Sequence, residues 1–211
     1  MIIIREKNQI SLTVMLSLLY CIGLIISDIN YLDDYGRYLL GYSGLSANGR
    51  PIADLVLTII NLGYPLLDLT PLSLIASIFV MAVSGVIIAD RFFRNEKPIV
   101  RSLVALLLIV NPFFIENLSF KYDIFPMSLS VLSISLAFYH TKNRFINLTS
   151  PVFLVFISLG LYQATLGMFV IFSIIELAWS TLNNTGTHKS RFIEIATRAL
   201  QLFIAYVLYK L

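Results

Sequence analysis

"SPVFLVFISLGLYQATLGMFVIFSIIELAWS", residues 150–180, decides how the chain divides into helices, because it is apolar almost throughout. As one helix, its 31 residues would be about 46 Å long at 1.5 Å per residue, whereas a lipid hydrocarbon core is roughly 30 Å thick. A polar break, GLYQAT at 160–165, interrupts the stretch. We therefore predict two short membrane-crossing helices that meet at this break.

The composition of the whole chain is that of a membrane protein. Of its 211 residues, 58% are hydrophobic and 13% are charged, whereas water-soluble domains carry about 25% charged residues. In lipid every backbone polar group needs a partner, so helices are the expected spans. Further apolar segments cover about 10–27, 71–89, 99–115, 123–139 and 194–211. We predict an all-α polytopic transmembrane helical bundle of about seven spans, a single transmembrane domain over residues 1–211.

The basic residues predict the orientation of these spans. With a cytoplasmic N-terminus, eleven basic residues fall on the cytoplasmic side and four on the outer side, as the positive-inside rule requires. The cytoplasmic set is Arg5, Lys7, Arg91, Arg94, Lys97, Arg101, Lys142, Arg144, Lys189, Arg191 and Arg198, and the outer set is Arg37, Arg50, Lys121 and Lys210. Because the net charge is only +3 and the basic residues are scattered, we expect no nucleic-acid partner.

The same division sorts the groups that could carry chemistry. Both histidines, His140 and His188, fall on the cytoplasmic side, so carboxylates are the candidates for a base on the outer side. The outer acids are Asp28, Asp33, Asp34, Asp54, Asp68, Glu116 and Asp123. The long outer loop, 28–70, also carries two short helical stripes, within 35–42 and 52–60, which predict interfacial helices.

Two adjacent aspartates stand in "INYLDDYGRYLLGYSGLSANGRP", residues 29–51. One interpretation is helix capping, since Asp33 precedes the predicted helix at Tyr35 and acidic residues suit a first helical turn. The other is a general base or a substrate anchor, because repulsion between adjacent carboxylates can raise the pKa of one of them. The sequence leaves both interpretations of Asp33 and Asp34 open.

Other polar residues lie at the outer ends of the predicted spans. Lys121 and Asp123 belong to "ENLSFKYDIFP", 116–126, which is either a solvated turn or a place to bind a phosphate and a hydroxyl. Arg37 and Arg50 are further phosphate candidates, although arginines near a membrane also extend toward lipid headgroups. Gln163, at the helix break, either bonds freed backbone groups or contacts a sugar. Together these residues suit a lipid-linked sugar phosphate.

The sequence contains no zinc, P-loop, dinucleotide or Ser-His-Asp signature, so we predict no cofactor. The outer carboxylates could hold a divalent ion, but their spacing does not require one.

Three motifs in order, "DDYGRYLLGYSGLSANGRPIADLV", "NPFFIENLSFKYDIFPMSLS" and "GLYQATLGMF", resemble the type II O-antigen glucosyltransferases, polytopic enzymes of the GT-C class. The resemblance implies transfer of a hexose, in particular glucose, from a polyprenyl-phosphate carrier to O-antigen or another surface polysaccharide. The reaction would occur on the periplasmic side of the bacterial inner membrane. By this likeness Asp33 and Asp34 match the catalytic acidic motif, while Lys121, Asp123 and Gln163 match later motifs. Members of that family are longer, so we expect an incomplete enzyme.

We therefore expect a membrane hexosyltransferase in which Asp33 or Asp34 is the base and Arg37, Arg50 and Lys121 stabilise the leaving phosphate. Its expected partners are the lipid-linked sugar, the polysaccharide acceptor and membrane lipid. Two alternatives remain open. One is a flippase or transporter of lipid-linked sugars, although the predicted second to fourth spans carry almost no polar groups to line a path. The other is an inactive fragment that packs against a second membrane subunit.

Overall fold

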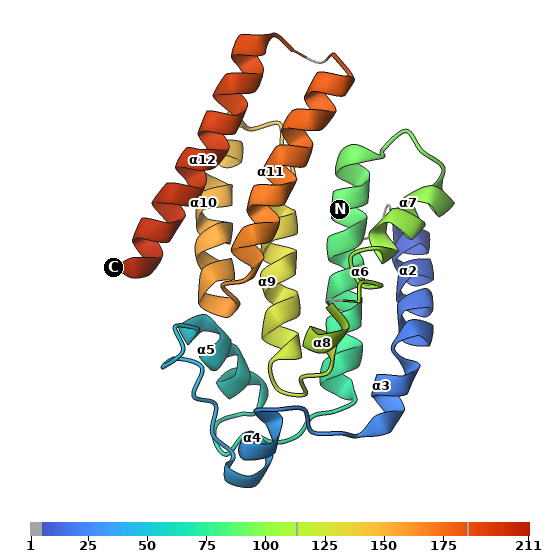
Figure 1. Cartoon of the computed structure of the whole chain (residues 1–211), viewed down its shortest axis with the longest axis vertical. Helices are drawn as coiled ribbons and strands as arrows, with labels where there is room; N and C mark the ends of the chain where they lie inside the picture. Colours follow the sequence, from blue (N-terminus) through green and yellow to red (C-terminus); the bar gives the residue numbers. More distant parts are fainter. Residues whose placement is uncertain (1–5, 113, 185) are drawn as a thin grey trace.

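The computed structural model of the chain describes residues 6–112, 114–184 and 186–211, and within these ranges the regular structure is helical, without a strand (Figure 1). The prediction of an all-α protein is thus confirmed. Arg5, one of the predicted cytoplasmic residues, lies outside the described ranges. The helices are α2 (Lys7–Tyr20), α3 (Ile22–Ser27), α4 (Asp34–Leu40), α5 (Pro51–Ile60), α6 (Leu72–Phe92), α7 (Pro98–Leu106), α8 (Phe114–Leu118), α9 (Ile124–Ala137), α10 (Arg144–Leu161), α11 (Thr165–Leu182) and α12 (His188–Lys210).

The predicted division of residues 150–180 is confirmed. Helix α10 ends at Leu161 and α11 begins at Thr165, so the turn between them, 162–164, lies within the GLYQAT segment. Both helices, together with α6 and α12, are long and apolar enough to cross a membrane. At the turn, the buried hydroxyls of Ser130, Ser158 and Thr165 lie 2.6–2.8 Å apart and join α9, α10 and α11. Such hydroxyl contacts are a common means of joining helices in lipid.

The predicted count of seven spans is not confirmed, because three expected spans are shorter or broken. Residues 10–27 form two helices that meet at Cys21, and α9 has only 14 residues. The prediction of a continuous span over 99–115 is wrong, since α7 ends at Leu106 and turns follow as far as Pro112. The proline ring disfavours a helical conformation at Asn111, which explains why the helix does not continue to 115.

The helices define a bundle with two distinct ends (Figure 1). Helices α4 and α5 gather at one end with the α10–α11 turn and the α8–α9 segment, and we call this the α4–α5 end. The α6–α7, α9–α10 and α11–α12 connections lie at the opposite end. Helices α6 and α9 pack against each other in the middle of the bundle, between the α2–α7 pair and the α10–α12 group.

Both short helices predicted in the outer loop are present, as α4 and α5. Each presents one apolar face away from the rest of the protein: Tyr35, Tyr38 and Leu39 of α4 are exposed, as are Leu55 and Ile59 of α5. Exposed apolar surface of this kind suits contact with lipid.

Gly85 allows α6 and α7 to approach each other closely. A Cβ atom at this position would lie 2.4 Å from the carbonyl oxygen of Ala105, which is backbone and has little freedom to move. A Cβ atom added at Gly23 in α3, by contrast, would have no atom within 4 Å. The two glycines therefore offer a matched pair for testing the α6–α7 contact.

We predict that Gly85→Ala lowers the free energy of unfolding by about 1–3 kcal/mol, because the added methyl overpacks the contact between two helices. Gly23→Ala is the control, and its methyl enters open space in a helix, so it should leave stability unchanged or slightly higher. Denaturant unfolding of the detergent-solubilised chain, followed by tryptophan fluorescence, measures both. Equal effects of the two substitutions would contradict the close α6–α7 approach.

Candidate functional site

A set of acidic and basic side chains gathers at the α4–α5 end, where three separate segments meet. Asp34 and Arg37 stand three residues apart on one face of α4 and point inward, while Arg50 precedes α5. Lys121 and Asp123 belong to the turn between α8 and α9. All except Arg50 are buried. The structure thus brings five of the seven sequence-predicted site residues to one place, and we call these five the acid–cation cluster.

Asp123 is shared between the two arginines. An Nη atom of Arg37 lies 2.7 Å from one of its carboxylate oxygens, and an Nη atom of Arg50 lies 3.4 Å from the other. The guanidinium of Arg50 also lies over the ring of Tyr162, 5.1 Å from its centroid, a cation–π arrangement. Asp123 therefore neutralises part of the positive charge that converges on it, and it holds α4, the loop before α5 and α9 together.

Asp34 is fully buried, and its two carboxylate oxygens differ in their hydrogen bonding. Its Oδ2 accepts a hydrogen bond of 2.8 Å from the backbone N–H of Lys121. Its Oδ1 lies 3.9 Å from Arg37 and accepts no hydrogen bond. Burial raises the pKa of the Asp34 carboxyl above its ordinary 3.8, against the opposing effects of the Lys121 N–H and of Arg37. We expected repulsion between the adjacent aspartates to raise this pKa, whereas burial is the main cause and the carboxylate that adds to it is that of Asp123, not that of Asp33.

Asp33 differs from the adjacent Asp34 in its exposure and in its contacts. It occupies the N-cap position of α4, but its side chain forms no capping hydrogen bond, so the structure does not support the capping interpretation, one of the two that the sequence left open. The side chain of Asp33 is exposed. The aspartate pair is therefore split into one buried and one accessible carboxylate.

Lys121 forms a second centre of charge within the cluster. Its ammonium lies 2.5 Å from Asp28, which follows α3, and 2.9 Å from Asp68, which lies between α5 and α6. Burial lowers the pKa of Lys121, but the hydrogen bonds and charges of the two carboxylates outweigh it and raise the pKa above 10.5. The sequence analysis did not single out Asp28 or Asp68 as site residues. A buried lysine predicts carboxylate partners, but nothing in the spacing of the chain identifies which ones.

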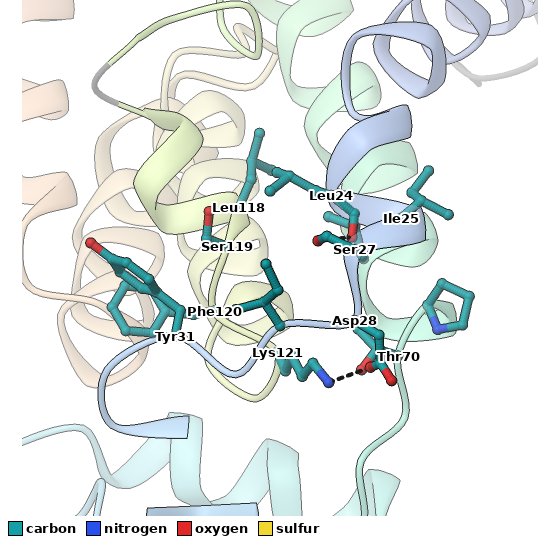
Figure 2. A pocket seen from close by; sticks show the side chains of 13 residues that line it. Leu24, Ile25, Ser27, Asp28, Tyr31, Thr70, Leu118, Ser119, Phe120 and Lys121 are labelled. Atoms are coloured by element: carbon teal, nitrogen blue, oxygen red, sulfur yellow. Dashed lines mark hydrogen bonds and ion pairs between the residues drawn. The ribbon is translucent and has the colours of Figure 1, made fainter. Parts of the chain in front are cut away.

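The Lys121 ammonium also borders a cavity of about 370 Å³ (Figure 2). Leu24 and Ile25 of α3 and Leu118 of α8 form an apolar part of its wall. Figure 2 shows Lys121 extending toward Asp28 and Thr70 at the polar part. The cavity thus offers an apolar wall and a charged group side by side, as an amphipathic ligand would require.

Gln163 lies apart from the acid–cation cluster. Its side-chain amide donates to the carbonyl oxygen of Gly49 at 3.1 Å and to the hydroxyl of Tyr209 at 2.5 Å. Gly49 has a φ of +72°, a conformation that favours glycine. Gln163 therefore fixes the backbone immediately before Arg50, and Tyr209 attaches the end of α12 to the same point.

The side chains that could together hold a metal ion lie away from the acid–cation cluster. Among the described residues, His140, Glu176 and Glu194 form a set close enough to hold an ion, and they lie at the opposite end of the bundle. Arg91 and Arg198 already pair with Glu176 at 2.5 and 2.9 Å, which disfavours a further cation at that carboxylate. In the acid–cation cluster Arg37 and Arg50 share the single carboxylate of Asp123, an arrangement that suits an anionic ligand better than a metal ion.

Fold and site define a class: a polytopic α-helical membrane protein with a buried cluster of carboxylates and cations at one end of its bundle. The chain belongs to the GtrII glucosyltransferase family, whose model, described as "Glucosyl transferase GtrII", matches residues 9–211. The resemblance drawn from the three sequence motifs is thereby confirmed.

A curated relative adds to this likeness. The chain is 37% identical over 169 residues to a Salmonella phage P22 protein described as an uncharacterized 55.3 kDa protein in the gtrB 5' region. The match covers 80% of this chain and 35% of the phage protein, so the chain spans little more than a third of that relative's length. No solved structure matches the chain.

We predict that the stability difference between the natural chain and Asp34→Asn depends on pH. Because folding raises the pKa of Asp34, this carboxyl stabilises the fold most below its unfolded pKa of about 3.8, and that contribution is lost as pH rises through the folded pKa. The natural chain should therefore lose stability relative to Asp34→Asn as the pH rises through the acidic range above about 4. Thermal unfolding in detergent across this range measures the difference; a gain with rising pH would refute the raised pKa.

Proposed function

We propose that the chain takes part in transferring a hexose, glucose in the first instance, from a polyprenyl-phosphate carrier to O-antigen or another surface polysaccharide. The reaction would take place on the periplasmic side of the bacterial inner membrane. Membership of the GtrII glucosyltransferase family supports the sugar transfer. The observation that carries the rest is the acid–cation cluster, which collects phosphate-binding groups and carboxylates beside a partly apolar cavity.

The distribution of charge supports a cytoplasmic N-terminus. The connections at the opposite end of the bundle carry the basic residues predicted for the cytoplasm, such as Arg94, Lys97, Lys142 and Lys189. The α4–α5 end would then face the periplasm. Its exposed tyrosines on α4 would lie at the headgroup level, where the ring is apolar and the hydroxyl is hydrated.

The two aspartates suit different tasks in this reaction. Asp33 is accessible, and we assign it the role of base that takes the proton from the acceptor hydroxyl as its oxygen attacks the anomeric carbon. Asp34 is buried, and we assign it a positioning role, because it holds the backbone of Lys121 and lies beside Arg37. The bond between the anomeric carbon and the phosphate oxygen breaks as the new glycosidic bond forms, and the phosphate leaves with both bonding electrons.

The cations would stabilise the departing lipid phosphate. Arg50 is the most accessible of the three, and Lys121 borders the cavity, so these two are the proposed direct contacts. Arg37 is buried against Asp123 and would act on the phosphate through its charge rather than through direct contact. Asp123 would keep both arginines aligned in the absence of phosphate. Gln163 would act at the edge of the site, by fixing the backbone before Arg50.

We predict that Asp33→Asn lowers the transfer rate by about 10²–10⁴-fold, because the amide cannot accept the hydroxyl proton. The assay follows labelled polyprenyl-phosphate glucose into lipopolysaccharide in membranes that contain the full chain. Glu96→Gln is the matched control, since it removes an exposed carboxylate at the opposite end and should leave transfer unchanged.

The kinetic pattern separates the two aspartates. Asp33→Asn should lower kcat with little change in KM for the donor, whereas Asp34→Asn should raise KM as well, because the cations lose their alignment. Transfer at the normal rate by Asp33→Asn would overturn the assignment of the base. Absence of any transfer by the natural chain would overturn the proposed activity.

A further inference from the structure

Two adjoining cavities at the side of the bundle, away from the acid–cation cluster, share part of their lining. The larger, about 670 Å³, is an apolar groove between α10 and α12. The smaller, about 270 Å³, is polar and lies toward the opposite end. Leu148, Thr197 and Gln201 line both. The two cavities therefore form one composite site with a polar part and an apolar part, which we call the α10–α12 site.

A proline and a glutamine build the junction between the two parts. Pro151 lies inside α10 and has no N–H, so it cannot donate the usual helical hydrogen bond to the carbonyl of Asn147. The side-chain amide of Gln201 in α12 donates instead, to Asn147 at 3.2 Å and to Leu148 at 3.0 Å. The junction is thus held by hydrogen bonds between the two helices.

The apolar groove runs along helices that face lipid. Phe153 and Phe156 of α10 line one side, and Leu200, Ile204 and Leu208 of α12 line the other. Phe153, Leu200 and Leu208 are exposed, and α12 is the least buried of the four candidate spans. An acyl chain is the occupant that such a groove meets in a bilayer.

The polar part offers one unpaired cation. Arg144, the first residue of α10, is exposed and forms no ion pair with the described residues. Arg198 lines the same pocket, but Glu176 neutralises it at 2.9 Å, and it also donates to Gln201 at 3.2 Å. Arg144 is therefore the group available to a phosphate.

The same pocket offers acceptors for a positively charged donor. Glu194 is partly buried and forms no hydrogen bond or ion pair with the described residues. His140 Nδ1 lies 3.2 Å from the carbonyl of Phe138, so this nitrogen carries the proton and Nε2 is left as an acceptor. Burial and the charge of Arg91 lower the pKa of His140 below 6.5, which keeps the ring neutral. The acceptor atoms of His140, Glu194 and Glu176 lie within 4.8 Å of one another.

We propose that the α10–α12 site binds a phospholipid whose headgroup carries both a phosphate and a primary ammonium, that is, phosphatidylethanolamine. Arg144 pairs with the phosphate, Glu194 and His140 accept hydrogen bonds from the ammonium, and one acyl chain lies in the groove. A basic pocket beside membrane helices is a recognised headgroup site, and the added carboxylate favours a zwitterion over a purely anionic lipid. This inference concerns the opposite end of the bundle and does not depend on glucosyl transfer.

The test compares headgroups on the natural chain. Native mass spectrometry of the full chain, released from detergent with phosphatidylethanolamine, phosphatidylcholine or phosphatidylglycerol, gives the bound fraction of each lipid. We expect phosphatidylethanolamine to bind at least about fivefold more tightly than the other two lipids. The trimethylated ammonium of phosphatidylcholine cannot donate a hydrogen bond, and the headgroup of phosphatidylglycerol has no cation. Equal binding of the three, or tighter binding of phosphatidylglycerol, would overturn the proposal.

Substitutions of single residues test which side chains cause the preference for phosphatidylethanolamine. Arg144→Gln should weaken binding of phosphatidylethanolamine about fivefold. Glu194→Gln should reduce it to the level of phosphatidylcholine. Lys142→Gln and Glu96→Gln are the matched controls, because they remove exposed charges outside the site, and neither should change binding. A loss with Lys142→Gln as large as that with Arg144→Gln would show adsorption to surface charge and refute the site. Tighter binding of polyprenyl phosphate than of phosphatidylethanolamine would also refute the proposed occupant.

Discussion

The ion pair between Arg37 and Asp123 is the contact on which the α4–α5 end depends. It joins residues separated by 86 positions, and both side chains are buried. Loss of either partner would leave the other charge buried without compensation, a situation that costs about 3–5 kcal/mol in proteins. Because Arg50 reaches the same carboxylate and Asp34 lies beside Arg37, the remaining members of the acid–cation cluster take their places around this pair.

The two ends of the bundle use charge in different ways. At the α4–α5 end, two arginines share the carboxylate of Asp123, and Asp33 and Arg50 remain accessible. At the opposite end, ion pairs hold helices together, as where Arg101 of α7 contacts Asp90 of α6 at 3.3 Å. One end therefore has the composition of a ligand site, and the other has mainly that of a structural junction with a lipid-facing pocket beside it.

Sequence patterns predicted the helical class, the break at 160–165 and the two short helices of the outer loop, because each rests on local composition and periodicity. They did not predict the end of α7 at Leu106, although Pro112 disfavours a helical conformation at Asn111 and so argues against a helix that continues to 115. For the candidate site, residue type pointed to Arg37, Lys121 and Asp123, which the structure brings together, while their roles stay a prediction. Burial was not predictable, since the adjacent Asp33 and Asp34 differ only through the packing of α4 against the α8–α9 turn.

A double-mutant cycle tests most directly whether distant segments assemble the cluster around one ion pair. The free energy of unfolding of the natural chain, Arg37→Gln, Asp123→Asn and the double variant gives the coupling energy between the two side chains. We expect a coupling energy of about 1 kcal/mol or more, with the double variant less destabilised than the sum of the two single variants. Additive effects of the two substitutions would contradict the account, because they would mean that Arg37 and Asp123 do not interact.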